Sequence, residues 1–480
     1  MAEDAERADS QRRQPEQVDP PQNPAATASM RRGLEAAAAE DYEAAAEAFT
    51  EAIAAAPRNA NARYNLALAR QRLGESDAAV LSYLRAIYLD PGLKAAYKNL
   101  GHLYRERGED EHALEAFRGV VELDNSDGEA YTNIGDLYLE MGFFDDAALA
   151  YRQAQIVNAE NALAAERLRE AREEIARQAE NLAELERDVD SRPHELDRYE
   201  RLCDAYLMAH REKDALNLAN QMVALAPDEP AAYETLALVH ETMDNAEEAA
   251  ATWQKIVELA PDDTEAWERL ANWRQETGDL DGAIDAYNHA LQLNPDATSV
   301  RFNKAEALRE AQRYDEAIAI FRELAHQFSD SHDDDDLLVE VYTGLAASLN
   351  LSERHAEALE VAQKLLKHFP EDPGAPYEKA SALEGLGLRD EAIAEFERAI
   401  ELDPLNPGVR NDLANAYLAS GRAAEAVDMA ESAVALEPEF ADAHETLAQA
   451  LLASGRTDEA EESARRAAEL HAAMGEESKS

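Results

Sequence analysis

Apolar residues recur along this chain at spacings of three and four, and this spacing predicts helices. Two such runs follow one another in one stretch: Tyr97, Leu100, Gly101 and Tyr104, then Ala113, Phe117 and Val120. Residues three or four apart share one face of an α-helix, so the stretch predicts two helices, with Gly108 at the turn between them. Gly101 and Ala113 are small, which suits the point where two antiparallel helices approach most closely.

The same order of residues returns every 34 positions, and a proline commonly ends the period. The prolines in phase are Pro57, Pro91, Pro193, Pro227, Pro261, Pro295, Pro370, Pro404 and Pro438. The gap between Pro91 and Pro193 is three whole periods, with Asn125 and Ala159 in the vacant places. Proline cannot continue a helix, so it closes each pair of helices. The period therefore predicts a tandem array of helix pairs.

These residues resemble the tetratricopeptide repeat (TPR), whose pattern is W-x-x-L-G-x-x-Y, then A-x-x-x-F, then P. One repeat matches at Trp267, Leu270, Ala271, Ala283, Tyr287 and Pro295, and another at Tyr131, Ile134, Gly135, Tyr138, Ala147 and Tyr151. The resemblance implies an all-α fold: a right-handed α-solenoid of about twelve helix-turn-helix repeats. We expect these repeats in two arrays joined by a long helix or a degenerate repeat.

The period sets the repeat boundaries. The first array spans 26–161, with repeats 26–59, 60–93, 94–127 and 128–161. The second array spans 196–474, with repeats 196–229, 230–263, 264–297, 298–331, 339–372, 373–406, 407–440 and 441–474. Each array is expected to fold by itself, because neighbouring repeats supply most of the contacts in a solenoid.

Residues 162–195 keep the length of a repeat but contain no glycine. Charged Arg169 and Asp188 occupy places that should hold small residues, so an ordinary helix pair is not expected there. An apolar stripe instead predicts one long helix, through Leu168, Ala171, Ile175, Leu182, Leu185 and Val189. The helix could be a spacer packed on its neighbours or, through 162–190, a dimerisation seam.

Three segments fall outside the repeats. Residues 1–25 are charged and rich in proline and glutamine, which predicts a disordered tail, and 475–480 form a second tail. An acidic insertion around 330–338 contains His332 followed by Asp333–Asp336. It lacks the alternating ligands, glycine and glutamate of a calcium-binding EF-hand loop, so we interpret it as a solvated surface loop rather than a metal site.

The chain has 100 acidic and 46 basic residues, for a formal charge of −54. Such a charge repels itself in dilute buffer, whereas ~1 M salt shortens the Debye length to ~3 Å. The composition is therefore typical of a protein from a salt-accumulating halophile, although an ordinary acidic surface would also produce it. Nucleic-acid binding is not expected, because a phosphate backbone requires basic patches.

No catalytic, cofactor or targeting motif accompanies the repeats. The sequence has no P-loop and no HExxH motif, and we expect neither enzymatic activity nor a cofactor. Residues 1–25 lack the apolar core of a signal peptide, and no stretch is apolar enough to span a membrane, so a soluble, cytoplasmic protein is expected. Cys203 fills a small-residue place and is interpreted as a buried structural thiol.

Function is then expected on the concave face, which the first helix of each repeat lines. In the first array the candidate peptide-binding residues are Tyr64, Asn65, Arg72, Lys98, Asn99, His102, Arg105 and Asn133. In the second array the inward residues are Asp197, Glu200, Asp204, Glu234, Glu265, Glu268, Asn272, Glu306, Asn411, Asn415, Glu445 and Gln449. The first groove is mildly basic and the second acidic, which predicts acidic ligands for the first and basic ligands for the second.

Some members of the family hold a carboxylate-ended peptide in a clamp of Lys, Asn, Asn, Lys and Arg. Lys98, Asn133 and Arg167 match that clamp, while His102 and Leu163 depart from it. The alternative is that Asn65, Asn99 and Asn133 serve contacts between helices. We expect a noncatalytic scaffold or adaptor that binds other proteins. The alternatives are a cochaperone-like receptor for acidic C-terminal peptides and an accessory subunit of an enzyme or an envelope-assembly complex.

Overall fold

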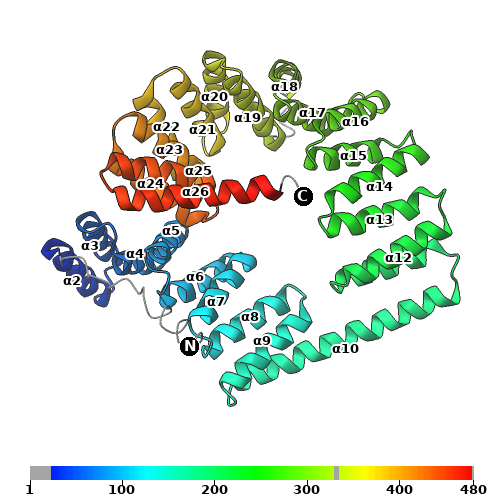
Figure 1. Cartoon of the computed structure of the whole chain (residues 1–480), viewed down its shortest axis with the longest axis horizontal. Helices are drawn as coiled ribbons and strands as arrows, with labels where there is room; N and C mark the ends of the chain where they lie inside the picture. Colours follow the sequence, from blue (N-terminus) through cyan, green and yellow to red (C-terminus); the bar gives the residue numbers. More distant parts are fainter. Residues whose placement is uncertain (1–22, 329–334, 478–480) are drawn as a thin grey trace, which may run out of the picture. The chain divides into compact units, whose positions relative to one another are not determined.

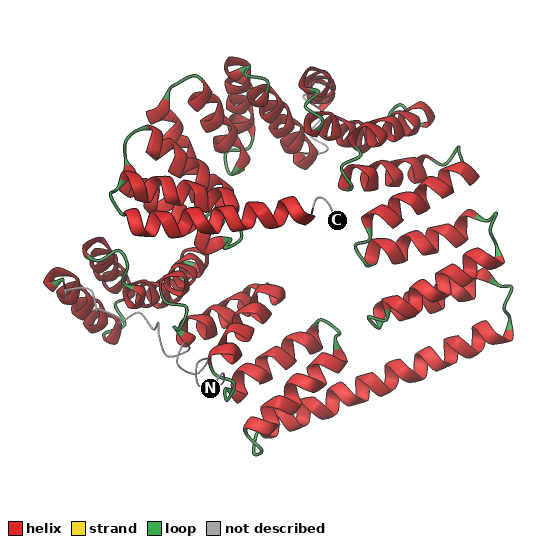
Figure 2. Cartoon of the chain, viewed as in Figure 1, coloured by secondary structure: helices red, strands yellow, loops and turns green. Residues whose placement is uncertain are grey.

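The structure, a computed structural model, describes residues 23–328 and 335–477 (Figure 1). It comprises two compact units, Met1–Leu103 and Tyr104–Ser480, called here the N-terminal and C-terminal units and described separately. The predicted tail up to residue 22, residues 329–334 of the acidic insertion with His332, and residues 478–480 lie outside the described part of the chain. Every regular element in the described ranges is helical (Figure 2), which confirms the all-α class.

Helices alternate as first and second members of pairs. The first helices are α2 (Pro24–Ala38), α4 (Ala60–Leu73), α6 (Lys94–Arg107), α8 (Gly128–Glu140), α11 (Leu196–Met208), α13 (Pro230–Thr242), α15 (Thr264–Glu276), α17 (Thr298–Glu310), α19 (Asp335–Leu351), α21 (Gly374–Gly385), α23 (Pro407–Ala419) and α25 (Ala441–Ala453). The second helices are α3 (Tyr42–Ala55), α5 (Ser76–Leu89), α7 (Asp110–Leu123), α9 (Phe144–Val157), α12 (Glu212–Leu225), α14 (Ala246–Leu259), α16 (Leu280–Leu293), α18 (Tyr314–Phe328), α20 (His355–His368), α22 (Arg389–Leu402), α24 (Ala423–Leu436) and α26 (Thr457–Glu477). Between α9 and α11 lies the unpaired helix α10 (Ala162–Ser191).

The turn inside each pair confirms the number of repeats. The fifteenth residue of every predicted repeat has a positive φ, and no other described residue does. Seven of these are Gly74, Gly108, Gly142, Gly278, Gly387, Gly421 and Gly455, and five are Glu40, His210, Asp244, Gln312 and Glu353. A left-handed residue ends the first helix and lets the chain reverse, and glycine adopts it without steric cost.

Small residues sit where the two helices of a pair cross. A Cβ added at Gly135 would lie only 2.6 Å from the ring of Tyr151, which is fully buried. In a later repeat Cys203 and Ala215 meet at the corresponding crossing, where the thiol lies 3.6 Å from the Ala215 carbonyl. Burial raises the pKa of Cys203 to about 12, so the thiol stays protonated. Its predicted structural role agrees with this position.

Helix α10 is one continuous helix of 30 residues. The first half of its apolar stripe, with Leu168 and Ile175, packs in the core formed with α8 and α9. The second half, with Leu182, Leu185 and Val189, packs in the core of α11, α12 and α13. This internal packing supports the spacer interpretation, while dimerisation stays untested. No helix in the described ranges, α10 included, is long and apolar enough to cross a lipid bilayer.

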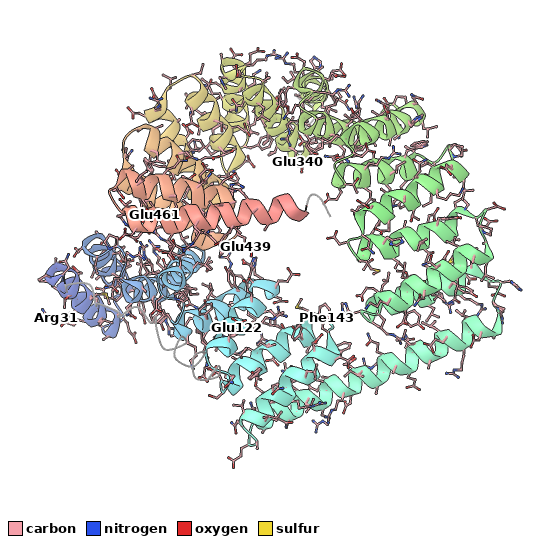
Figure 3. All side chains as sticks on the ribbon, viewed as in Figure 1. Arg31, Glu122, Phe143, Glu340, Glu439 and Glu461 are labelled. Carbon is pink, nitrogen blue, oxygen red and sulfur yellow. The ribbon has the colours of Figure 1, made fainter. Side chains whose placement is uncertain are left out.

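A contact between two turns accompanies α10. Phe143, labelled in Figure 3, is the N-cap residue just before the second helix of repeat 128–161, and His210 is the left-handed residue of repeat 196–229. Their rings stack with centroids 3.7 Å apart. Gln178, near the middle of α10, donates to the Met208 carbonyl at 3.5 Å. The turns of the two repeats therefore touch although α10 lies between them in the chain.

Candidate functional site

Six of the eight predicted peptide-binding residues lie in the N-terminal unit. Tyr64, Asn65 and Arg72 are on α4, and Lys98, Asn99 and His102 are on α6. The Asn99 amide donates to the Tyr64 hydroxyl at 3.1 Å. The Asn65 amide donates to the Asn61 carbonyl at 2.7 Å. Each of the two amides thus donates one N–H within the protein.

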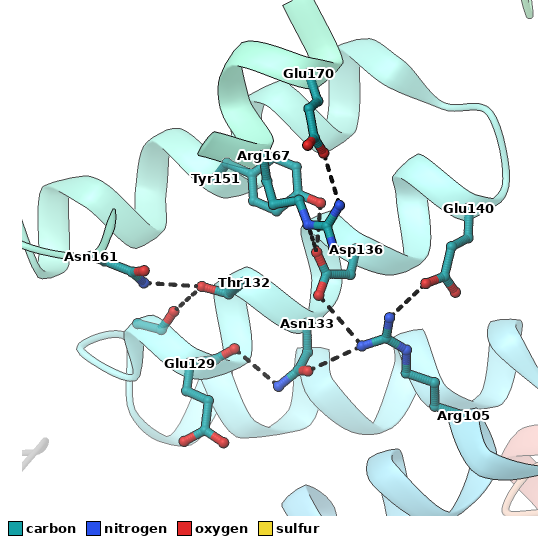
Figure 4. A network of polar contacts seen from close by, with 11 residues as sticks. Arg105, Glu129, Thr132, Asn133, Asp136, Glu140, Tyr151, Asn161, Arg167 and Glu170 are labelled. Carbon is teal, nitrogen blue, oxygen red and sulfur yellow. Dashed lines mark hydrogen bonds and ion pairs between the residues drawn. The ribbon is translucent and has the colours of Figure 1, made fainter. Parts of the chain in front are cut away.

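The other two residues, Arg105 and Asn133, lie in the C-terminal unit and take part in a polar network (Figure 4). The Arg105 guanidinium lies 3.5 Å from both the Asn133 side-chain oxygen and Asp136. It donates to Glu140 at 2.6 Å. Arg105 was predicted as a peptide-binding residue of a mildly basic groove, and in the structure two carboxylates compensate its charge.

Asp136 is the centre of this network, which we call the Asp136 network. Besides Arg105, it accepts a hydrogen bond from the Tyr151 hydroxyl at 2.7 Å and lies 3.7 Å from Arg167. Arg167 also pairs with Glu170 at 2.8 Å. Burial, and secondly the bond to Asp136, raises the pKa of Tyr151, so its hydroxyl remains a donor.

The Asp136 network also occupies part of the predicted clamp. Arg167 is engaged with Asp136 and Glu170, and the Asn133 amide donates to the Glu129 carbonyl at 3.1 Å. Leu163, which stands where the clamp has a lysine, is 51% exposed on α10 and offers no charge. The contact of Asn133 with Arg105 of α6, at 3.5 Å, favours the alternative in which this asparagine serves packing between helices.

A different surface combines carboxylates with an aromatic wall. A pocket of about 250 Å³ is formed by residues of α13, α14 and α15 and of the turn before α15, and we call it the acidic pocket. Its lining residues are Glu234, Leu238, Glu241, Trp253, Asp263, Glu265, Ala266 and Arg269. Four carboxylates therefore share this space with one guanidinium.

Glu241 holds the aromatic side of the acidic pocket in place. Its Oε1 atom accepts hydrogen bonds from the indole nitrogens of Trp253, at 2.7 Å, and Trp273, at 2.6 Å. The Arg269 guanidinium lies 3.5 Å from the same carboxylate and 6.0 Å from the centre of the Trp253 ring. The wall thus already contacts one guanidinium, in the arrangement of a cation–π interaction.

The remaining carboxylates of the acidic pocket are less well compensated. Asp263 caps α15 by accepting from the backbone nitrogens of Glu265 and Ala266, at 2.9 and 3.2 Å. Glu265 has only a long contact to Arg269, at 3.9 Å. Partial burial, followed by the charges of Asp263, Glu200 and Glu265, raises the pKa of Glu234. Within the described part of the chain, no basic side chain pairs with Glu234.

The structure brings together only some of the predicted acidic-groove residues. Glu200, Glu234 and Glu265 are electrostatic neighbours, and Glu268 has a raised pKa through burial and the charge of Glu265. Others have partners of their own: Asn272 accepts from Tyr287, Glu306 pairs with Arg309, and Asn415 accepts from Thr446. Sequence reasoning missed Glu241, Trp253 and Arg269, although a Trp and an Arg within one repeat period of acidic positions was a visible signal.

One group of potential metal ligands occurs among the described residues. Asp442, Glu445 and His471 place ligand atoms within 4.8 Å of one another, and all three side chains are exposed. His471 lies 3.7 Å from Asp442. Exposed acidic groups commonly gather without a metal, so this cluster carries no assignment.

Comparison with protein families finds repeat models along most of the chain. Models described as tetratricopeptide repeat match residues 30–94, 268–332 and 352–407, then 387–430 and 417–473, then 230–273 and 128–161. A model described as TPR repeat matches residues 101–142. No curated protein matches the chain.

Several solved structures are similar to the chain in fold. Yeast Tom70 has 19% identity and a TM-score of 0.44, with 86% of this chain and 92% of that chain covered. The Cut9–Hcn1 hetero-tetramer of the APC/C has 15% identity and a TM-score of 0.38, with 89% and 96% covered. A thermophilic TPR protein of Thermus thermophilus has 22% identity and a TM-score of 0.35, with 40% and 100% covered. These are likenesses of fold alone.

Proposed function

Because the chain belongs to the tetratricopeptide repeat family, we propose that it is a noncatalytic protein-interaction scaffold that binds a basic peptide segment in the acidic pocket. The observation that carries this proposal is the charge balance of that pocket, where four carboxylates face one guanidinium. At Glu234 in particular, the charges that raise the pKa are all acidic, from Asp263, Glu200 and Glu265. A lysine or arginine entering beside Glu234 would relieve this repulsion and gain a charge-assisted hydrogen bond.

The aromatic wall gives the proposed ligand a second contact. Trp253 already lies under the guanidinium of Arg269, so the pocket shows how a planar cation can be held between a carboxylate and an indole face. Exposed Leu238 adds an apolar surface for the methylene groups of a lysine or arginine. The arrangement therefore suits the long side chains of a basic peptide.

The same reasoning weakens the case for an acidic ligand around Arg105. That guanidinium already contacts Asp136 and Glu140, so an incoming carboxylate would have to compete with two existing ion pairs. Binding of acidic ligands by the predicted residues of the N-terminal unit, including Lys98 and His102, stays an untested prediction.

Tryptophan fluorescence offers a direct test. The three tryptophans of the chain are Trp253, Trp267 and Trp273, and two of them donate to Glu241 at the acidic pocket. Titration with a short, tryptophan-free lysine peptide should change the emission and saturate. The matching glutamate peptide should not. Glu234→Gln combined with Glu265→Gln should weaken binding of the lysine peptide by about tenfold, equivalent to ~1.4 kcal/mol.

A matched control separates the pocket from the overall charge. Glu122→Gln combined with Glu439→Gln removes the same number of charges at exposed positions outside the pocket (Figure 3). This variant should bind like the parent at equal ionic strength. Equal weakening in both variants would mean that binding is a diffuse charge effect, and the proposed site would then be wrong.

A further inference from the structure

The helix pair α25 and α26 carries an open apolar groove. It has a volume of about 540 Å³, and its floor includes Ala448, Leu452, Ala464 and Ala468. Leu452 is 62% exposed, which is the largest exposed fraction among the exposed leucines of the described residues. Glu445 and Glu461 stand at the edge of the floor. An apolar surface of this kind is costly in water unless something covers it.

Comparison with the preceding repeat shows what shape would cover the groove. Thirty-four residues before Ala464 and Ala468 stand Ala430 and Val434, which are 0% and 1% exposed. These residues belong to one core with α25, which packs against α24. Ala464 and Ala468 are exposed at the same positions of α26. The groove therefore corresponds to the surface on which α24 packs the first helix of the next repeat, and its shape suits a helix.

The first repeat treats its outward side differently. Leu447 and Ala450 of α25 are fully buried against the preceding repeat, and the corresponding residues of α2 are Arg32 and Glu35. Both are exposed and form ion pairs, Arg32 with Glu51 and Glu35 with Arg31. The outer side of α25 and α26 instead keeps Leu452, Ala464 and Ala468 exposed beside Glu445 and Glu461.

We propose that this groove, which we call the C-terminal groove, binds an amphipathic helix of a partner protein, with an apolar stripe flanked by lysine or arginine. The stripe would rest on Leu452 and the alanine floor, and the basic residues would face Glu445 and Glu461. Glu461 is exposed where it lines this groove. Charge complementarity therefore selects a basic helix over a neutral one.

A second copy of the chain is a poorer occupant. Its α2 would bring Arg32 and Glu35 onto an alanine floor, which would bury both charges. Its own C-terminal groove would bring the same glutamates face to face, and like charges repel. The partner helix is thus the occupant that satisfies both the floor and the edge.

The test uses the full chain and a fluorescein-labelled helical peptide with leucines at i, i+3, i+4 and i+7 and lysines elsewhere. The chain carries Glu234→Gln and Glu265→Gln, so that loss of the acidic pocket cannot be confused with loss of this groove. Fluorescence anisotropy should show saturable binding, and circular dichroism should show added helicity. Replacing the lysines of the peptide by glutamate should weaken binding by about tenfold or more.

Variants on α26 complete the test. Ala464→Gln with Ala468→Gln fills the groove at exposed positions and should weaken binding by about tenfold or more. Ala472→Gln with Ala473→Gln, exposed on the same helix outside the groove, should leave it unchanged. Undiminished binding to the filled groove would overturn the proposal. So would self-association of the parent chain that the filled groove abolishes, because the occupant would then be a second copy.

Discussion

The Asp136 network and the acidic pocket contain the same kind of side chain in opposite electrostatic conditions. Asp136 is 14% exposed and has Arg105, Arg167 and the Tyr151 hydroxyl around it. Glu234 is exposed, and the charges that raise its pKa come from carboxylates alone. In this pair the partly buried carboxylate is compensated by cations, whereas the accessible one is not. In a protein of net charge −54, the charged partners of a carboxylate indicate its role better than its negative charge does.

Removing the Asp136 carboxylate should produce the largest difference in stability between the Asp136 network and the acidic pocket. Asp136→Ala would leave the guanidiniums of Arg105 and Arg167 and the buried Tyr151 hydroxyl without their shared acceptor. We expect a loss of about 3 kcal/mol in local stability. Glu234→Ala should change stability by less than about 0.5 kcal/mol. Hydrogen exchange in peptides from α8 and α10 measures the first change and exchange in peptides from α13 measures the second, and an equal loss of protection in the two variants would contradict the comparison.

A third carboxylate, Glu378, tests burial without a dedicated cation. It accepts from Asn350 at 2.9 Å, and burial raises its pKa to about 7. The folded chain therefore binds this proton more tightly than the unfolded chain, whose pKa is near 4.5, so its contribution to stability is lost as pH rises from 4.5 through 7. Glu378→Gln should be more stable than the parent at alkaline pH by about 2–3 kcal/mol. Denaturant titrations should show this difference shrinking as pH falls below 7.

Salt should relieve regions that lack internal compensation. Raising KCl from ~0.1 M to ~1 M should increase the unfolding midpoint by about 5 °C, or roughly 1–2 kcal/mol, because screening weakens repulsion among the excess carboxylates. Circular dichroism melts measure this shift. The loss caused by Asp136→Ala should remain in high salt, because its contacts are partly buried. A midpoint indifferent to KCl would remove the interpretation of the composition as halophilic.

Charge reversal within the acidic pocket should have the smallest effect on stability. Glu234→Lys with Glu265→Lys replaces repulsion by attraction toward Asp263 and Glu241. The side chains are largely in solvent, so we expect a gain of only about 0.5 kcal/mol at low salt, vanishing near 1 M. Thermal melts of the reversed and parent chains at two KCl concentrations would measure it. Destabilisation at low salt would show that these carboxylates have favourable contacts.

The sequence predicted the elements well because each depends on local spacing. The 34-residue period placed all twelve turns, including those where His210 or Gln312 replaces glycine. The long helix after Asn161 followed from an unbroken apolar stripe without a turn residue. Small places such as Gly135 and Cys203 were recognisable because the repeat fixes which residues meet inside a pair. These features do not depend on the packing angle between one helix pair and the next.

The candidate site was less predictable because its contacts cross between repeats. Arg105 reaches Asn133, Asp136 and Glu140, which are 28 to 35 residues away. Trp273 reaches Glu241 across 32 residues. Whether such side chains meet depends on the angle between successive pairs, and the period alone does not determine that angle. The sign of a groove could be predicted, but its internal pairing could not.

The left-handed turns have a mechanical consequence. Among the repeats of the C-terminal unit, His210, Asp244, Gln312 and Glu353 occupy this conformation between residues 196 and 372, while the last three repeats use glycine at each turn. A residue with a side chain costs roughly 1–2 kcal/mol there. Under tension or heat, such a solenoid should therefore part first in its interior, at a strained joint, rather than peel from its final repeats. Such a break leaves two shorter folded segments. Each segment can then regain the unfolded repeats by adding helix pairs to its folded end.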